Sequence, residues 1–184
     1  MKRTLALALV SALFAAGCAQ KAPQLRVEPT YQEAANAPLL QNSREAVGRL
    51  VAGLDVAATG PGPVLVATVV NVNDLSRSAP LGRTLSEQYA NAMAATGFDV
   101  KEIKLRGDVF VKEGAGELLL SREIKDIARH HNASMVLVGT YSPAANFTYV
   151  SMKLVRTEDS RIIRGHDYAL PNDRDVQRLL AVAR

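Results

Sequence analysis

Two apolar runs limit most strongly the folds that are open to this chain. Residues 64–72 read VLVATVVNV, and residues 135–141 read MVLVGTY. Continuous apolar runs rich in β-branched side chains are typical of strands that are buried on both faces of a sheet. Strands of this kind need helices to cover them, so we expect a layered α/β domain.

Helices are predicted before and between these two runs. Pro80 suits the first turn of a helix, the apolar stripe Leu81–Met93 follows it, and Gly97 is placed to end it. An earlier helix is expected to begin at Asn42 or Ser43, because both are good N-cap residues and an apolar stripe at helical spacing follows them.

The middle of the chain is predicted to carry short strands and a third helix. Residues 98–105 and 109–111 are predicted as strands, with a glycine-rich turn at 113–116. Ser121 is expected to cap the third helix, and Asn132 to end it.

The last part of the chain is predicted to be an antiparallel hairpin and a final helix. Residues 147–156 and 161–170 form its strands, residues 157–160 its turn, and Asp173 caps the helix. The whole pattern predicts an α/β (α+β) domain: a mixed, largely parallel sheet of about five strands packed by helices, closed by this hairpin and helix.

The amino-terminal segment has the features of a secretory signal peptide. Lys2 and Arg3 precede an uncharged stretch, residues 4–17, which is too short to span a bilayer. Small residues then lead to Cys18. This arrangement resembles the bacterial lipobox, although Ala15 stands where leucine is commonest. The resemblance implies cleavage before Cys18 and attachment of diacylglycerol to its thiol, with further acylation.

The alternative is an ordinary signal peptide followed by a buried free cysteine. Cys18 is the only cysteine, so no intramolecular disulfide is possible, and an odd thiol is a liability in an oxidising compartment. Lipidation removes that thiol. The predicted organisation is therefore a signal peptide (1–17), a lipidated amino terminus and tether (18–41), and one α/β domain (42–184). Three prolines are expected to keep the tether extended and out of helix.

The charge balance disfavours nucleic acid as a partner. Two of the 22 basic side chains, Lys2 and Arg3, are removed with the predicted signal peptide. The remaining chain has 20 basic and 18 acidic side chains, so its net charge is +2 instead of +4. Charges of both signs are interspersed, with no run of lysines or arginines.

No catalytic or metal-binding arrangement is evident. His130 and His131 are adjacent at a predicted helix end, where neighbouring side chains point apart, and His166 is isolated in the predicted hairpin. No nucleophile elbow, dinucleotide fingerprint or P-loop occurs. The chain is not expected to be an enzyme or to bind a metal or cofactor.

Two polar stretches are candidate partner-binding loops. Residues 74–78, with Asp74 and Arg77, follow a buried strand, where ligands often bind in α/β sheets. Residues 120–123 include Arg122 and precede the third helix. The alternative for both is a capping loop whose side chains bond free backbone amides.

A series of short segments between Asn73 and Leu170 resembles the FlgO family of outer-membrane lipoproteins associated with flagella. In chain order the segments are Asp74–Ser78, Pro80–Arg83, Ser86–Gln88, Gly97–Val100, Leu120–Glu123, Val138–Tyr141, Tyr149–Val150, Leu154–Arg156 and Asp167–Pro171.

The resemblance implies a non-catalytic envelope protein that supports flagellar motility by binding protein partners in the basal body or outer membrane. It also implies a fold similar to the amino-terminal domain of TolB-like envelope proteins. Ala19, rather than aspartate, follows Cys18, which favours the outer membrane, with the domain in the periplasm. Two alternatives are a periplasmic binding module that regulates a cell-wall or transport complex, and an enzyme that acts on cell-wall material.

Overall fold

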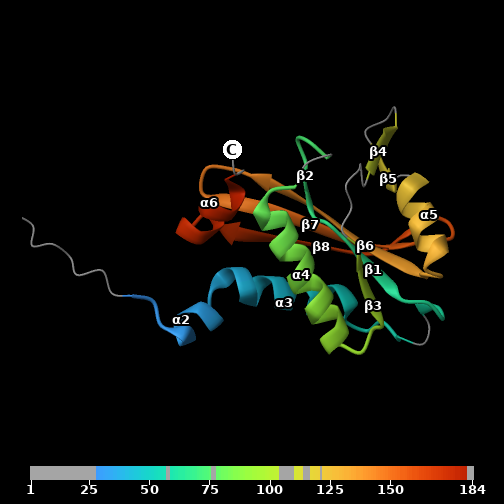
Figure 1. The fold of residues 1–184 in the computed structure, drawn as a ribbon, viewed down its shortest axis with the longest axis horizontal. Coiled ribbons are helices and arrows are strands. Elements are labelled where there is room, and N and C mark those ends of the chain that lie inside the picture. Colours follow the sequence, from blue (N-terminus) through green and yellow to red (C-terminus); the bar gives the residue numbers. More distant parts are fainter. Residues whose placement is uncertain are drawn as a thin grey trace, which may run out of the picture. The chain divides into compact units, whose positions relative to one another are not determined.

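Helices and strands alternate along the chain much as the sequence predicts (Figure 1). The computed structural model describes residues 28–56, 59–75, 78–103, 110–113, 117–120 and 122–181, with the backbone alone for 110–113, 117–120 and 122–124. The helices are α2 (Tyr31–Ala35), α3 (Pro38–Val51), α4 (Pro80–Ala95), α5 (Arg122–His130) and α6 (Arg174–Leu180). The strands are β1 (Val64–Ala67), β2 (Val70–Asn71), β3 (Val100–Ile103), β4 (Phe110–Glu113), β5 (Glu117–Leu120), β6 (Met135–Pro143), β7 (Phe147–Arg156) and β8 (Ile162–Pro171). No helix within these residues is long and apolar enough to cross a membrane.

A mixed sheet forms the centre of the domain. In the described part of the chain it has six strands in the order β3-β1-β6-β7-β8, and β2 pairs with β6 beyond the end of β1. The pairs β1–β3, β1–β6 and β2–β6 are parallel, whereas β6–β7 and β7–β8 are antiparallel. β4 and β5 form a separate antiparallel pair. The predicted fold class, including the closing hairpin and helix, is therefore confirmed.

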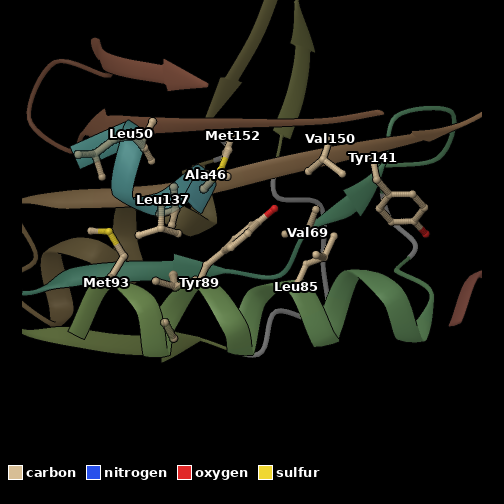
Figure 2. Packing of buried hydrophobic residues seen from close by; sticks show 14 of the residues in the cluster. Ala46, Leu50, Val69, Leu85, Tyr89, Met93, Leu137, Tyr141, Val150 and Met152 are labelled. Atoms are coloured by element: carbon tan, nitrogen blue, oxygen red, sulfur yellow. The ribbon is translucent and has the colours of Figure 1, made fainter. Parts of the chain in front are cut away.

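The two faces of the sheet are covered unequally. α3, α4 and α6 pack on one face, where Leu50 and Tyr89 meet Leu137 of β6 and Met152 of β7 (Figure 2). On the opposite face, α5 contributes Ala128 to a smaller cluster with β1 and the first half of β6. Alternate strand residues enter each cluster, because successive side chains point to opposite faces. No described helix covers the rest of this second face.

The first long helix begins earlier than predicted. α3 starts at Pro38, not at Asn42 or Ser43, and α2 is a further helical turn before it. The prediction that proline keeps residues 19–41 out of helix is thus wrong for Tyr31–Ala35, which form α2, and for residues 38–41, which begin α3. Pro38 lies in the first turn of α3, where its missing N–H costs no hydrogen bond and its fixed φ suits a helix.

Asn42 and Ser43 bond across the domain instead of capping a helix. Asn42 Nδ2 donates to the Ala169 carbonyl of β8 at 3.3 Å. The buried Ser43 hydroxyl lies 2.8 Å from the Leu39 carbonyl and 2.5 Å from Oε1 of Gln88 on α4. These contacts tie α3 to the edge strand and to the neighbouring helix.

The first predicted strand is interrupted and divides into β1 and β2. Val66 and Val70 are four positions apart, whereas their partners on β6, Leu137 and Thr140, are three positions apart. One strand therefore carries an extra residue, which defines a β-bulge at residues 68–69. The bulge releases backbone groups from the sheet ladder, and these must find other partners.

Several predicted element ends are confirmed. Gly97 (φ +94°) follows α4, and Asn132 (φ +50°) follows α5. Glycine and asparagine adopt this left-handed conformation at low cost. The strand predicted at 109–111 corresponds to β4, and β5 completes its hairpin. The predicted cap Ser121 and the turn residues 114–116 lie outside the described residues.

Asp173 caps α6 as predicted, since its Oδ1 accepts a hydrogen bond from the N–H of Val176 at 2.9 Å. We expect Asp173→Ala to lower the free energy of unfolding by about 1 kcal/mol, measured by urea denaturation. Asp175→Ala is the matched control: this exposed acid lies in the same first turn and makes no capping bond, so only a smaller helix-dipole effect is expected. Equal losses in the two variants would contradict the capping role.

Candidate binding surfaces

The structure places one of the three predicted contact residues. Asp74 lies three residues after β2, at the carboxyl end of the parallel strands, as predicted. Arg77 lies outside the described residues, and Arg122 begins α5 with only its backbone described. Contacts made by Arg77 and Arg122 therefore stay predictions.

Asp74 lies in a tight turn that Asn71 closes. The N–H of Asp74 donates to the Asn71 carbonyl at 3.1 Å, and the N–H of Asn73 donates to Asn71 Oδ1 at 2.9 Å. A hollow of about 210 Å³ beside the turn is lined by Asn71, Asp74, Ser78, Ala79, Tyr141, Pro143 and Leu180. Sites for small molecules usually enclose roughly 300–1,000 Å³, so this one suits a single side chain better.

Two serines, which we call the serine clamp, hold the bulge between β1 and β2. Ser78 Oγ donates to the Val69 carbonyl at 2.8 Å, and the Val69 N–H donates to Ser86 Oγ at 2.9 Å. Ser86 Oγ donates in turn to the Gly82 carbonyl at 2.7 Å. The interpretation of residues 74–78 as a loop that bonds free amides is wrong for Ser78, because its hydroxyl donates to a carbonyl. Ala79 is the N-cap residue of α4 and offers no side-chain cap, while its own N–H donates to the Tyr141 hydroxyl at 3.1 Å.

The second face of the sheet is open where β2, β6 and β8 end and β7 begins. A broad hollow of about 600 Å³, here called the sheet-end hollow, lies on this surface. It is lined by Val72, Thr140, Ser142, Tyr149, Val150, Ser151, Asp167, Tyr168 and Ala169. The lining includes apolar, hydroxyl and carboxylate groups, so it offers a partner contacts of more than one kind.

Sequence reasoning missed this surface, although β7 carries a signal of it. Thr148 and Val150 are buried against the helices, while Phe147 and Tyr149 alternate with them and are exposed. β7 thus carries large apolar side chains on both of its faces, and no described helix covers the face of Phe147 and Tyr149. Exposed apolar side chains on such a face indicate a binding surface.

A buried pair of hydroxyl groups joins α4 to β8. The Tyr89 and Tyr168 hydroxyl oxygens lie 2.6 Å apart. Burial raises the pKa of Tyr89 well above its ordinary value, and the Tyr168 hydroxyl raises it further. Burial also raises the pKa of Tyr168, while the hydrogen bond to Tyr89 lowers it in part. Both tyrosines are held neutral inside the domain, so the pair has a structural role.

The histidines lie where the sequence predicts. His130 ends α5, and its ring meets that of His131 edge to face, with centroids 5.4 Å apart. His166 lies on the edge strand β8 and stacks on Tyr168 at 6.5 Å. No group of three or more potential metal ligands forms among the residues that the structure describes.

Fold and surfaces together define a small α/β domain that packs helices on one face of a mixed sheet and leaves part of the other face open. The chain belongs to the FlgO protein family, whose model matches residues 44–175. This match covers the helices and strands from within α3 to the start of α6, and it confirms the family predicted from the sequence.

Comparison with solved structures gives more distant similarities. The LpoB C-terminal domain from Escherichia coli is 19% identical, with a TM-score of 0.49, over 72% of this chain and 97% of that one. The PelC dodecamer from Paraburkholderia phytofirmans is 17% identical, with a TM-score of 0.44, over 64% and 75%. Lipoprotein GNA1162 from Neisseria meningitidis is 13% identical, with a TM-score of 0.41, over 62% and 84%. No curated protein sequence matches the chain. The identification therefore depends on the family match.

Proposed function

We propose that this protein is an outer-membrane lipoprotein that acts as a non-catalytic structural or adaptor component in flagellum-based motility. The observation that carries the proposal is the FlgO family match over residues 44–175. The lipobox-like sequence before Cys18 supports attachment to a membrane through lipid, and Ala19 supports the outer membrane.

The described structure is compatible with a binding role. The sheet-end hollow is broad, lies on an open sheet face and is lined by tyrosine, valine and hydroxyl groups. Tyrosine is over-represented among the residues that dominate protein interfaces. The two tyrosines with raised pKa values bond each other through their hydroxyl groups, and Tyr168 also lines this hollow.

Swimming in soft agar tests the proposal. We expect a clean deletion strain to swim poorly and the wild-type gene to restore swimming. Cys18→Ala should not restore it, because it removes the only thiol that can carry the anchoring lipid. Ala15→Leu is the matched control: it brings the sequence closer to the commonest lipobox and should swim as wild type.

Each contrary outcome is informative. Normal swimming by the deletion strain would remove the flagellar role, and defects in cell shape or envelope integrity would then favour the binding module of a cell-wall or transport complex. Full restoration by Cys18→Ala would show that lipid attachment is not part of the mechanism.

A further inference from the structure

Exposed apolar side chains gather beside the sheet-end hollow. Among the side chains that the structure describes within residues 32–181, the most exposed large apolar ones are Val56, Val72, Phe147, Tyr149 and Ile162. Three of these five lie on the open end of the sheet: Val72 is 42% exposed, Phe147 44% and Tyr149 55%. Apolar side chains gathered on a soluble domain mark a contact surface.

Two groups in the same hollow attract a cation. Asp167 is exposed and lines the hollow, and no described lysine or arginine lies within ion-pair distance of it, including Lys153 on the same face. Asp167 pairs with Ser151 in the β7–β8 ladder, which places it diagonally across from Tyr149. Diagonal neighbours are roughly 7–8 Å apart, within reach of one bound side chain. The face of a tyrosine ring also attracts cations.

The geometry points to a protein partner that inserts a lysine or arginine, flanked by an apolar side chain, into the sheet-end hollow. The cation meets the Asp167 carboxylate and the Tyr149 ring, and the apolar neighbour covers Val72 and Phe147. The charged side chain in the lining is a carboxylate, so the hollow favours a cationic group over an acidic one. That this partner is part of the flagellum rests on the function proposed above.

The docking itself is tested in solution on the purified full-length protein. The probe is the peptide acetyl-Phe-Lys-Phe-amide, and acetyl-Phe-Glu-Phe-amide is its control. In an NMR titration we expect the lysine peptide to shift the amide signals of Val72, Tyr149 and Asp167 and to bind at least tenfold more tightly than the glutamate peptide. Asp167→Asn should abolish that difference. Equal binding of the two peptides, or shifts confined to other residues, would overturn the proposal.

Charge reversal tests the same contact in cells. We expect Asp167→Lys and Tyr149→Ser each to reduce the rate of swim-ring expansion at least threefold. Glu102→Lys, an exposed acid on the opposite edge strand β3, and Ile162→Ser, an exposed apolar residue away from the hollow, are the matched controls and should swim as wild type. Thermal unfolding of all four should stay within about 2 °C of wild type, since surface substitutions change stability little.

Motile revertants of Asp167→Lys give a second readout. They should carry a lysine or arginine changed to an acidic residue in another protein, which would identify the partner. If Asp167→Lys and Tyr149→Ser swim as wild type while the deletion does not, the docking proposal is wrong and the flagellar role stands. If the deletion itself swims normally, the flagellar role is wrong, and the peptide titration still decides whether the hollow binds a cation.

Discussion

Replacing Gly82 by alanine is expected to lower the free energy of unfolding by about 3 kcal/mol, at the upper end of the usual cost of overpacking. A Cβ at Gly82 would overlap the carbonyl oxygen of Val69 and the Oγ of Ser78. Neither neighbour can retreat, because the Val69 carbonyl accepts the Ser78 hydrogen bond and the Val69 N–H is held by Ser86. The added methyl group must therefore separate α4 from the bulge or break the serine clamp. Urea denaturation measures the loss.

Gly48→Ala is the control for this prediction. Gly48 lies on the exposed side of α3, with no atom within 4 Å of the position that a Cβ would take. The same substitution should there stabilise the domain by roughly 0.5–1 kcal/mol, because alanine loses less conformational entropy in a helix. If both variants change stability in the same direction, the explanation is wrong that glycine is needed at position 82 because α4 packs closely on the bulge.

Strongly alkaline solution is expected to weaken the domain through the Tyr89–Tyr168 pair. Both pKa values are raised in the folded state, so the unfolded chain releases these two protons first, from about pH 10. The stabilisation is fully present below pH 10 and falls as the pH rises toward the folded pKa values, by about 1.4 kcal/mol per unit for each tyrosine. Between pH 9.5 and 11.5 we therefore expect wild type to lose stability progressively through this pair.

The double variant Tyr89→Phe/Tyr168→Phe isolates this effect. Removal of both hydroxyl groups should change stability little at pH 7, because no polar group is left unpaired, whereas Tyr89→Phe alone should cost about 1 kcal/mol. Urea denaturation at several pH values should show that the double variant lacks the alkaline loss. An equally steep loss in wild type and double variant would assign the alkaline weakness to other groups.

Elements whose signals are local could be predicted from the sequence. β7 matches the predicted range 147–156, and α4 runs from Pro80 nearly to Gly97, because proline and glycine act through their own backbone conformations. The parallel strands could be predicted because burial on both faces leaves no polar alternation.

Features that depend on distant residues could not be predicted in this way. The bulge at residues 68–69 lies in an unbroken apolar run, and its hydrogen-bond partners Ser78 and Ser86 lie 9 and 17 residues beyond Val69. A proline can stop a helix or occupy its first turn, depending on the residues after it. The proline content of residues 19–41 therefore could not show that α3 begins at Pro38. The sheet-end hollow requires β2 and β8 to lie on either side of β6 and β7, which only the assembled sheet specifies.

The bond between Asn42 and Ala169 joins residues that are 127 positions apart, and it bears on how such a chain can be secreted. α3 comes first in the domain and packs on β8, the last strand, so the core cannot close until nearly the whole domain is available. In the exported chain that we propose, the amino end crosses the membrane first and must wait, unfolded, for the carboxyl end. Long-range closure of this kind is slow, which leaves time for translocation and makes the emerging segment dependent on chaperones.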